Sequence, residues 1–215
     1  MTVALPIPGS PDAIATFDGL VSAIQYNLKD TTLEDHAPRF IYLAECEFNR
    51  VLNNLENEYT VLTEFSDERI SLPNDFKSVR SIYLDTDPRT ALKYVTPQVL
   101  RSGWADQTTG QPEVYSLIAN EIVFGPAPDG AYTISLTYDR MLTALSSANQ
   151  SNWLVEKHAD LYLYAALVHA EFYGWNDERI PMMRQFVDGV IEQINTVANR
   201  RRIGPGLRMR PSVVV

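Results

Sequence analysis

The chain has 215 residues, of which 45% are hydrophobic and 21% are charged, a composition typical of globular proteins that argues against a disordered or fibrous chain. Its 18 basic and 27 acidic residues give a formal net charge of -9, which disfavours nucleic-acid binding through a basic face. The single cysteine, Cys46, excludes an intrachain disulfide and a thiolate zinc cluster.

Two helices are predicted near the start of the chain, after an extended N-terminal arm of residues 1–15 that three prolines interrupt. Apolar residues recur every three or four positions from Phe17 to Leu28, and Thr16 is a suitable N-cap for this helix. A second helix is predicted over residues 33–55, where a similar apolar stripe runs. Because few residues separate the two helices, we expect them to pair as a hairpin.

A strand-rich unit follows, within an inserted domain at residues 56–145, because the apolar period changes to two. Its clearest strand covers residues 131–139, where apolar and hydroxyl side chains alternate, so one face of this strand is expected to be wet. Thr96 followed by Pro97 predicts a short helix that reaches Gly103. The predicted strands cover residues 59–65, 78–84, 91–95, 113–118, 121–124 and 131–139.

Helical spacing returns in residues 153–173 and 177–202, and Asn176 is the expected N-cap of the last helix. The apolar stripe of that helix runs from Ile180 to Val197 and is joined by Phe186. The pattern predicts an α+β fold, in which an antiparallel helical bundle of two N-terminal and two C-terminal helices carries the inserted β-rich domain and ends in an extended tail. The bundle would comprise residues 16–55 and 146–202, and the tail residues 203–215.

Residues 161–168, LYLYAALV, are apolar or aromatic on every side of a helix, which calls for cover on two flanks. Two interpretations are open: this segment is the central helix of the bundle, or one of its flanks packs on another copy of the protein. It is too short to cross a membrane, which takes roughly 20 apolar residues, so no membrane partner is expected. The side chains assigned to a subunit interface are Tyr162, Tyr164, Leu167 and Phe172.

The C-terminal tail segregates charge. From Arg200 onward there are five arginines and no acid, whereas residues 1–199 hold 13 basic and 27 acidic residues, a formal charge of -14. The final valines have high strand propensity and could add to the sheet edge of a partner, with the arginines pairing to acidic rims. A solvated terminus and a phosphate-binding segment are the alternatives. The candidate partner-binding residues are Arg200, Arg201, Arg202, Arg208, Arg210, Val213, Val214 and Val215.

No residue pattern predicts a catalytic, cofactor-binding or metal site. On a continuous helix His158 and His169 would lie about 16 Å apart, which is too far for one metal ion. Glu45 and Glu47 are two residues apart on a helix and do not face each other, as the carboxylates of a glycosidase would. The sequence contains neither a nucleophile elbow nor a phosphate-binding loop. We therefore expect no enzymatic activity and no cofactor.

Three segments in a fixed order carry a family resemblance. The first is Leu72-Pro-Asn-Asp-Phe76, which precedes a predicted strand. The others read TGQPEVYSLIANEIVFGPAPDGAYTISLTYDR from Thr109 to Arg140 and NWLVEKHADLYLYAALVHAEFY from Asn152 to Tyr173. In this combination the chain resembles the head-to-tail adaptor, or connector, family of tailed bacteriophages, and it looks most like the tail tubular protein A type.

The resemblance implies a structural virion protein without enzymatic activity. Members of that family assemble as a ring, usually of twelve copies, beneath the portal at the capsid vertex. The expected partners are therefore further copies of the chain, the portal protein and a tail nozzle or tail protein. The ring would extend the channel through which double-stranded DNA passes during ejection without specific binding. Its expected location is the head-tail junction of the virion, after assembly in the host cytoplasm.

One alternative function follows from the aromatic residues of the inserted domain. Trp104, Tyr115 and Tyr132 could form a platform for sugars in a carbohydrate-binding or hydrolytic tail component. Aromatic residues on strands also pack in cores and across strands, so the two interpretations differ in whether these three side chains lie together on one exposed face.

Overall fold

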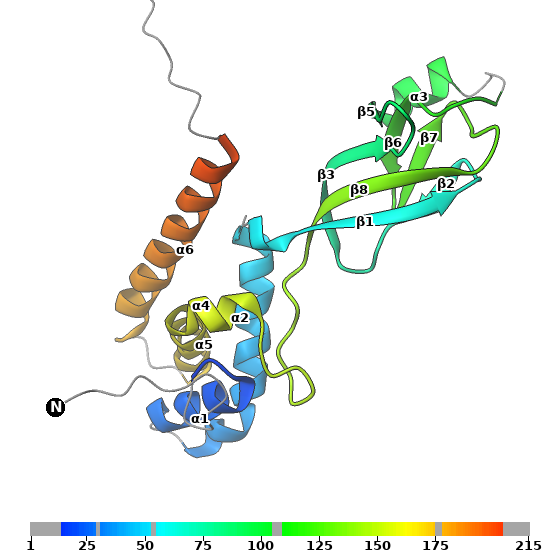
Figure 1. The fold of residues 1–215 in the computed structure, drawn as a ribbon. Helices are drawn as coiled ribbons and strands as arrows, with labels where there is room; N and C mark the ends of the chain where they lie inside the picture. The colour runs from blue at the N-terminus through cyan, green and yellow to red at the C-terminus, as the bar shows by residue number, and fades with distance from the viewer. Residues whose placement is uncertain (1–13, 29–30, 53–54, 105–108, 175–177, 204–215) are drawn as a thin grey trace, which may run out of the picture. The chain divides into compact units, whose positions relative to one another are not determined.

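The computed structural model describes residues 14–28, 31–52, 55–104, 109–174 and 178–203 and has a mixed α+β fold (Figure 1). The chain forms two compact units. One unit contains the described residues up to Glu56 and from Leu142 onward, and the other is Asn57–Met141. Of the helices in the described ranges, none is long and apolar enough to span a membrane. The predicted N-terminal arm and C-terminal tail lie almost entirely outside these ranges and stay predictions.

The first unit is helical, and its helix starts follow local sequence signals. The hydroxyl of Thr16 accepts a hydrogen bond from the Gly19 amide (3.1 Å), which confirms it as the predicted N-cap. The predicted helix over residues 33–55 begins as a 3-10 turn and becomes α-helical at Ala37, because Pro38 favours the first turn of an α-helix. The helices are α1 (Phe17–Asn27), η1 (Thr31–His36), α2 (Ala37–Val51), η2 (Leu55–Asn57), α4 (Trp153–Lys157), α5 (Ala159–Tyr173) and α6 (Ile180–Ile203).

The single helix predicted over residues 153–173 is wrong at one position. His158 leaves the helical region of the backbone, with φ -140° and ψ 53°, so it ends α4 and begins α5. Its amide donates to the Leu154 carbonyl (2.7 Å), and its carbonyl accepts from the Leu161 amide (3.1 Å). Asn152 caps α4, since its side-chain oxygen accepts from the amides of Leu154 and Val155. The predicted cap Asn176 lies outside the described residues.

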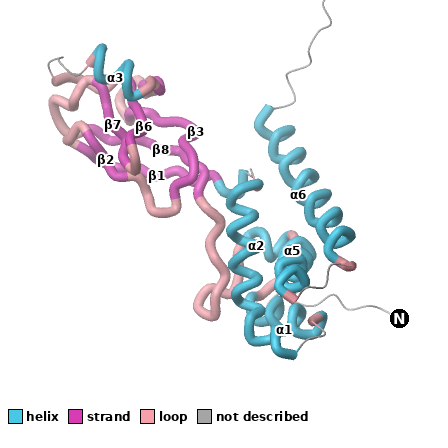
Figure 2. Tube along the Cα trace, turned by 180° about the vertical axis from the view of Figure 1, so that it is seen from behind, coloured by secondary structure: helices cyan, strands magenta, loops and turns pink. Residues whose placement is uncertain are grey.

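Helix α5 lies at the centre of the helical core, in contact with α1, α2, α4 and α6 (Figures 1 and 2). The ring of Phe48 meets the ring of Tyr162 edge-on, with 5.1 Å between the ring centres. Leu142 and Leu145 also pack in this core, although the sequence boundary at residue 145 assigned them to the inserted unit. The helix that is apolar all round is therefore covered mainly by its own chain.

A buried polar network runs through this core. The Glu45 carboxylate accepts hydrogen bonds from the Leu145 amide (2.8 Å) and the Tyr162 hydroxyl (3.2 Å). The Asn152 amide group donates to the Tyr162 hydroxyl and to the Thr143 carbonyl, each at 2.8 Å. Burial raises the pKa of the Glu45 carboxyl, although its two donors act in the opposite direction. The network ties α2 and α5 to the segment that returns from the second unit.

The second unit contains two four-stranded sheets. Figure 2 shows the strands of this unit in magenta. The first has the order β1 (Glu58–Phe65), β8 (Tyr132–Arg140), β3 (Phe76–Leu84) and β4 (Thr90–Ala91), all antiparallel. The second has the order β2 (Arg69–Ser71), β7 (Glu121–Gly125), β6 (Val114–Ile118) and β5 (Lys93–Tyr94), with β5 parallel to β6. Both sheets contribute to one core cluster, as Phe65 of β1 and Phe124 of β7 show with ring centres 4.3 Å apart.

The strand predictions are confirmed where alternation was clear. Along β8, Ile134, Leu136 and Tyr138 are buried, as the period of two predicts. Asp139 lies on the face that was expected to be solvent-exposed, but it is buried and pairs with Arg80 (2.5 Å). The predicted strand over residues 91–95 is two short strands, since Leu92 pairs with Ile82 of the first sheet while Lys93 pairs with the second.

Helix α3 (Pro97–Gly103) covers the other side of the second sheet, where it contacts β6. Thr96 is its N-cap, as predicted, and accepts a hydrogen bond from the Val99 amide (3.4 Å). Leu100 packs there with Val114 and Val123 in a small separate core. The approach to β7 is close, because a Cβ at Gly125 would lie 2.7 Å from the Leu100 Cδ1 atom.

Candidate assembly surface

The four predicted interface residues of α5 separate into two pairs. Tyr162 and Leu167 are 0% and 3% exposed in the core of their own chain, so the structure removes them from the candidate interface. Tyr164 and Phe172 are 37% and 74% exposed and remain candidates. Because α5 is apolar on every side, its sequence does not show which side the neighbouring helices leave exposed, and so the prediction included both buried and exposed residues.

Helix α6 carries a ridge beside its buried stripe, with exposed apolar side chains at three of its five positions. We call Met182, Phe186, Gly189, Gln193 and Val197 the α6 ridge, since their spacing places them along one side of the helix. Met182 is 70% exposed, Phe186 40% and Val197 47%. The buried stripe of the same helix is Met183, Val187, Ile191, Ile194 and Ala198.

The sequence assigned Phe186 and Val197 to the buried stripe, and their exposure corrects that prediction. The neighbours of α6 bury one side of its apolar face and leave Phe186 and Val197 at the edge of that face exposed. The ring of Phe186 lies against the ring of Tyr164, with 4.7 Å between the ring centres. The ridge therefore continues onto α5 through one of the predicted interface residues.

Gly189 lies in the interior of α6, at the middle of the ridge. A Cβ built on it would meet nothing within 4 Å, so no neighbour in the described part of the chain requires a residue without a side chain at this position. Gly174 differs, because a Cβ there would lie 3.2 Å from Leu33. Glycine in a helix interior costs about 0.5–1 kcal/mol relative to alanine. No packing contact among the described residues compensates for this loss of helix stability.

A groove borders the C-terminal half of the ridge and has a volume of about 400 Å³. Its apolar lining comes from Val190, Ile194 and Val197 of α6. The charged lining includes Asp160 and Arg201, together with an ion pair in which Lys157 Nζ lies 2.6 Å from Glu56 Oε1. An apolar floor with charges of both signs at the rim suits a polypeptide surface.

Polar contacts fix α6 against the rest of the helical unit. Arg184 pairs with Glu47 of α2 (2.7 Å) and with Asp188 (3.2 Å). Glu47 also contacts Nε2 of His169 at 3.4 Å. His169 and Arg184 together lower the pKa of the Glu47 carboxyl, against the opposing effect of burial. These contacts hold the ridge in a defined position on the surface.

The arginines predicted to bind a partner are only partly described. Arg200 and Arg201 are exposed near the C-terminal end of α6. Arg202 belongs to the same helix. The other candidates lie outside the described residues, namely Arg208, Arg210, Val213, Val214 and Val215.

The aromatic residues of the sugar-platform alternative are not brought together. Tyr115 is 8% exposed and lies in the core shared by the two sheets, where Tyr132 also packs. Trp104 packs instead in the small core beneath α3. The three side chains therefore belong to two different cores, and the structure contradicts a common binding face.

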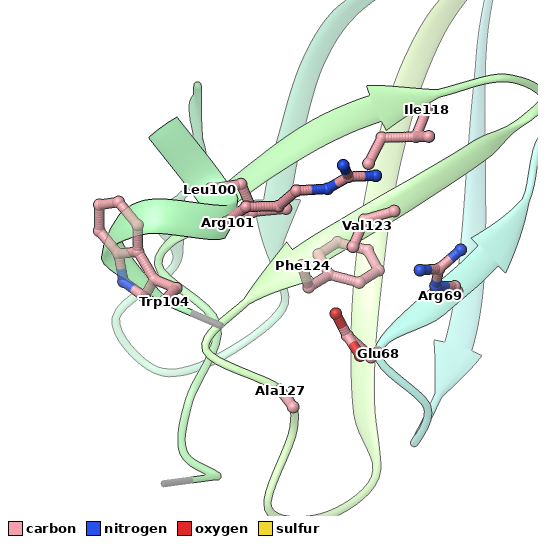
Figure 3. Close-up of a pocket in the computed structure, with 9 residues that line it drawn as sticks. All are labelled: Glu68, Arg69, Leu100, Arg101, Trp104, Ile118, Val123, Phe124 and Ala127. Carbon is pink, nitrogen blue, oxygen red and sulfur yellow. The ribbon is translucent and has the colours of Figure 1, made fainter. Parts of the chain in front are cut away.

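Beside Trp104, a cavity of about 100 Å³ lies between α3 and the second sheet (Figure 3). Its lining includes Glu68, Arg69 and Arg101 over an apolar floor that contains Val123 and Phe124. Arg69 is paired with Glu121 at 3.3 Å. The volume is below the roughly 300 Å³ at which small-molecule sites begin. Within the described ranges, no group of three or more metal-binding side chains is placed to hold an ion.

The chain matches a known protein family. The model of a family described as SU10 adaptor protein matches residues 15–210, which is most of the chain. The match includes all the described helices and strands. No curated protein matches the chain.

Proposed function

The chain belongs to the SU10 adaptor protein family, a family of phage structural adaptors, and from this membership we propose that it assembles as a ring between the portal and the tail of a bacteriophage. The ring would extend the channel for DNA and would stand at the head-tail junction of the virion. The family match carries the proposal. The tail tubular protein A likeness of the sequence refines it, with about twelve copies as the expected ring size.

The surface of the helical unit supports self-assembly. A closed ring requires two different, complementary surfaces on each copy. The α6 ridge with Tyr164 offers one exposed surface, and Phe172 with Tyr173 offers exposed aromatic side chains at the C-terminal end of α5. Exposed apolar residues scattered singly are normal on proteins, but several along one side of a helix, in contact with an exposed tyrosine of the next helix, are typical of an interface.

The charge of the chain supports a role as a conduit for DNA. Its formal net charge is -9, so a ring of many copies would carry a large negative charge. Such a wall repels phosphate and lets DNA slide past without specific binding. The same charge works against a function as a nucleic-acid-binding protein.

The arginine-rich end of the chain is the proposed contact with the portal protein. Arg200 and Arg201 mark the exposed helical start of this segment, and Arg202, Arg208 and Arg210 follow in sequence. The terminal valines, Val213 to Val215, would add as a strand to the edge of a partner sheet while the arginines pair with acidic residues.

Electron microscopy of the purified protein mixed with a portal ring tests the function. We expect a second ring stacked on the portal, in which the copies are related by rotation about the common channel. Portal rings that stay bare at micromolar concentrations of the protein would contradict the proposal. A carbohydrate-binding role has no support, because the structure separates the aromatic residues on which it depended.

A further inference from the structure

We propose that Gly189 is the point at which a helix of a second copy of this chain crosses the α6 ridge at close range. This inference rests on the proposed assembly into a ring and identifies the surface through which neighbouring copies pack. The ridge would supply side chains on both sides of the crossing, and the glycine would let the two helix backbones approach.

The first argument is the unexplained glycine. A mid-helix glycine weakens the helix, because it widens the choice of unfolded conformations and contributes no side chain. Some glycines make up for this by allowing a close contact, as Gly125 does where α3 approaches β7. At Gly189 the space for a Cβ is empty. The described part of the chain therefore supplies no close contact at this position, and one that compensates for the glycine would come from outside it.

The second argument is the setting of the glycine. Phe186 stands one turn before Gly189 on the same side of α6, and Gln193 stands one turn after it. Met182 and Val197, at the ends of the ridge, are fifteen residues apart, or about 22 Å along the helix axis. That length is enough for the side chains of a crossing helix to fit into the ridge, with large residues flanking a small one at the centre.

The third argument concerns the identity of the neighbour. Just beyond the ridge, α6 ends with exposed Arg200 and Arg201. Residues 1–199 carry a formal charge of -14, from 13 basic and 27 acidic residues. A second copy therefore brings an acidic surface to the basic end of the helix, and opposite charges favour association in that register. The chain supplies both halves of this complementarity, so a second copy is the occupant. Arg200 and Arg201 at the end of α6 then contact this copy, and Arg208 and Arg210 remain the proposed contacts with the portal.

The Gly189→Ala variant tests the inference because it acts in opposite directions on folding and on assembly. In the isolated chain, alanine strengthens α6 without meeting a neighbour, so the melting temperature of the monomer should rise by about 1–4 °C. In the assembly, the added methyl group lies between two helix backbones, so self-association should weaken by at least about tenfold. Sedimentation velocity over a range of concentrations, with thermal unfolding at the lowest, measures both.

Gly103→Ala is the control for association, since Gly103 is the last residue of α3, away from the ridge, and a Cβ there also meets nothing within 4 Å. It should leave association at the wild-type level. Gly189→Leu should abolish assembly while the chain still folds, as circular dichroism would show. A Gly189→Ala protein that associates like wild type, or a monomer that it destabilises, would overturn the inference.

The outcomes separate this inference from the proposed function. If the wild-type protein and the Gly189→Ala variant both form rings on portals, this result contradicts the inference but not the proposed function. Protein that self-associates through a Gly189-sensitive contact but never binds portal rings supports the inference and contradicts the portal role. Wild-type protein that neither self-associates nor binds portal rings contradicts both.

Discussion

The Tyr162 hydroxyl donates a hydrogen bond to the Glu45 carboxylate at 3.2 Å, inside the helical core. Both residues are buried, and the same carboxylate oxygen also accepts from the Leu145 amide. A single oxygen atom thus satisfies two buried donors from distant parts of the chain. Glu45 is therefore the central hydrogen-bond acceptor of this buried network.

Glu45→Leu should destabilise the protein, because it leaves the Leu145 amide and the Tyr162 hydroxyl without their acceptor. Each buried group left without a partner costs about 1–3 kcal/mol. Glu45→Gln keeps an oxygen for both donors and should cost far less. Denaturant unfolding of the two variants measures the difference. Equal losses would show that the hydrogen bonds do not hold the network together.

The pH dependence of the Glu45→Gln variant has a defined sign. Burial raises the pKa of Glu45 in the folded state, so the folded protein is penalised as this carboxyl ionises. This destabilisation is absent at pH values below the pKa of Glu45 in the unfolded chain, and it is complete at pH values above the pKa of Glu45 in the folded protein. The stability of Glu45→Gln relative to wild type should therefore increase as the pH rises through that range. A difference that is constant with pH would contradict this assignment.

Glu47 should show the opposite behaviour. Its pKa is lowered by His169 and Arg184, so its stabilising effect is present above the unfolded pKa and is lost as the pH falls through the folded one. Glu47→Gln should be less stable than wild type at neutral pH and should lose less stability on acidification. Unfolding midpoints across the acidic range test this, and parallel curves for the two proteins would rule it out.

Gly125→Ala should destabilise the β-rich unit by about 1–3 kcal/mol, as overpacking in a core does. The new methyl group would lie 2.7 Å from Leu100 Cδ1 and 3.1 Å from Trp104, so α3 would have to move away from β7. Gly130→Ala, where a Cβ meets nothing within 4 Å, is the control and should change little. Thermal unfolding and tryptophan fluorescence measure the effect. A stable Gly125→Ala protein with an unchanged spectrum would contradict the tight approach.

Loss of the C-terminal segment should separate folding from portal binding. Removal of residues 204–215 leaves the described helices and strands complete, so thermal unfolding should stay close to wild type. Attachment to portal rings should be abolished, and Arg208→Glu combined with Arg210→Glu should have the same effect through charge reversal alone. Co-sedimentation with portal rings measures attachment. Truncated protein that still co-sediments would show that the contact lies elsewhere.

Sequence patterns predicted the parts of the fold that depend on local signals. Thr16 and Thr96 cap helices because a hydroxyl at that position satisfies free amides wherever the helix packs. The short strand β2 was missed, since its three residues, Arg69 to Ser71, are too few to show a period of two. His158 interrupts a helix for which the flanking residues give no breaker signal.

The candidate surface was predictable only in part. Tyr164 was predicted as an interface residue and is exposed, but Phe186 beside it was assigned to the core. Periodicity identifies the apolar side of a helix. How much of that side is buried depends on the crossing angles of the neighbouring helices, which periodicity does not show. Gly189 carried no sequence signal, because a glycine in a helix becomes informative only when the space around it is known.

The attachment of the return segment to α2 has a consequence for how such chains can diverge. Asn49 accepts a hydrogen bond from the Leu142 amide (2.7 Å), and Glu45, one turn earlier, accepts from Leu145. The helix that leads into the β-rich unit therefore also fastens the chain that comes back from it. Because α2 holds both the entry into the β-rich unit and the return from it, a change in the length of that unit would leave the register of the helices that carry it unaltered.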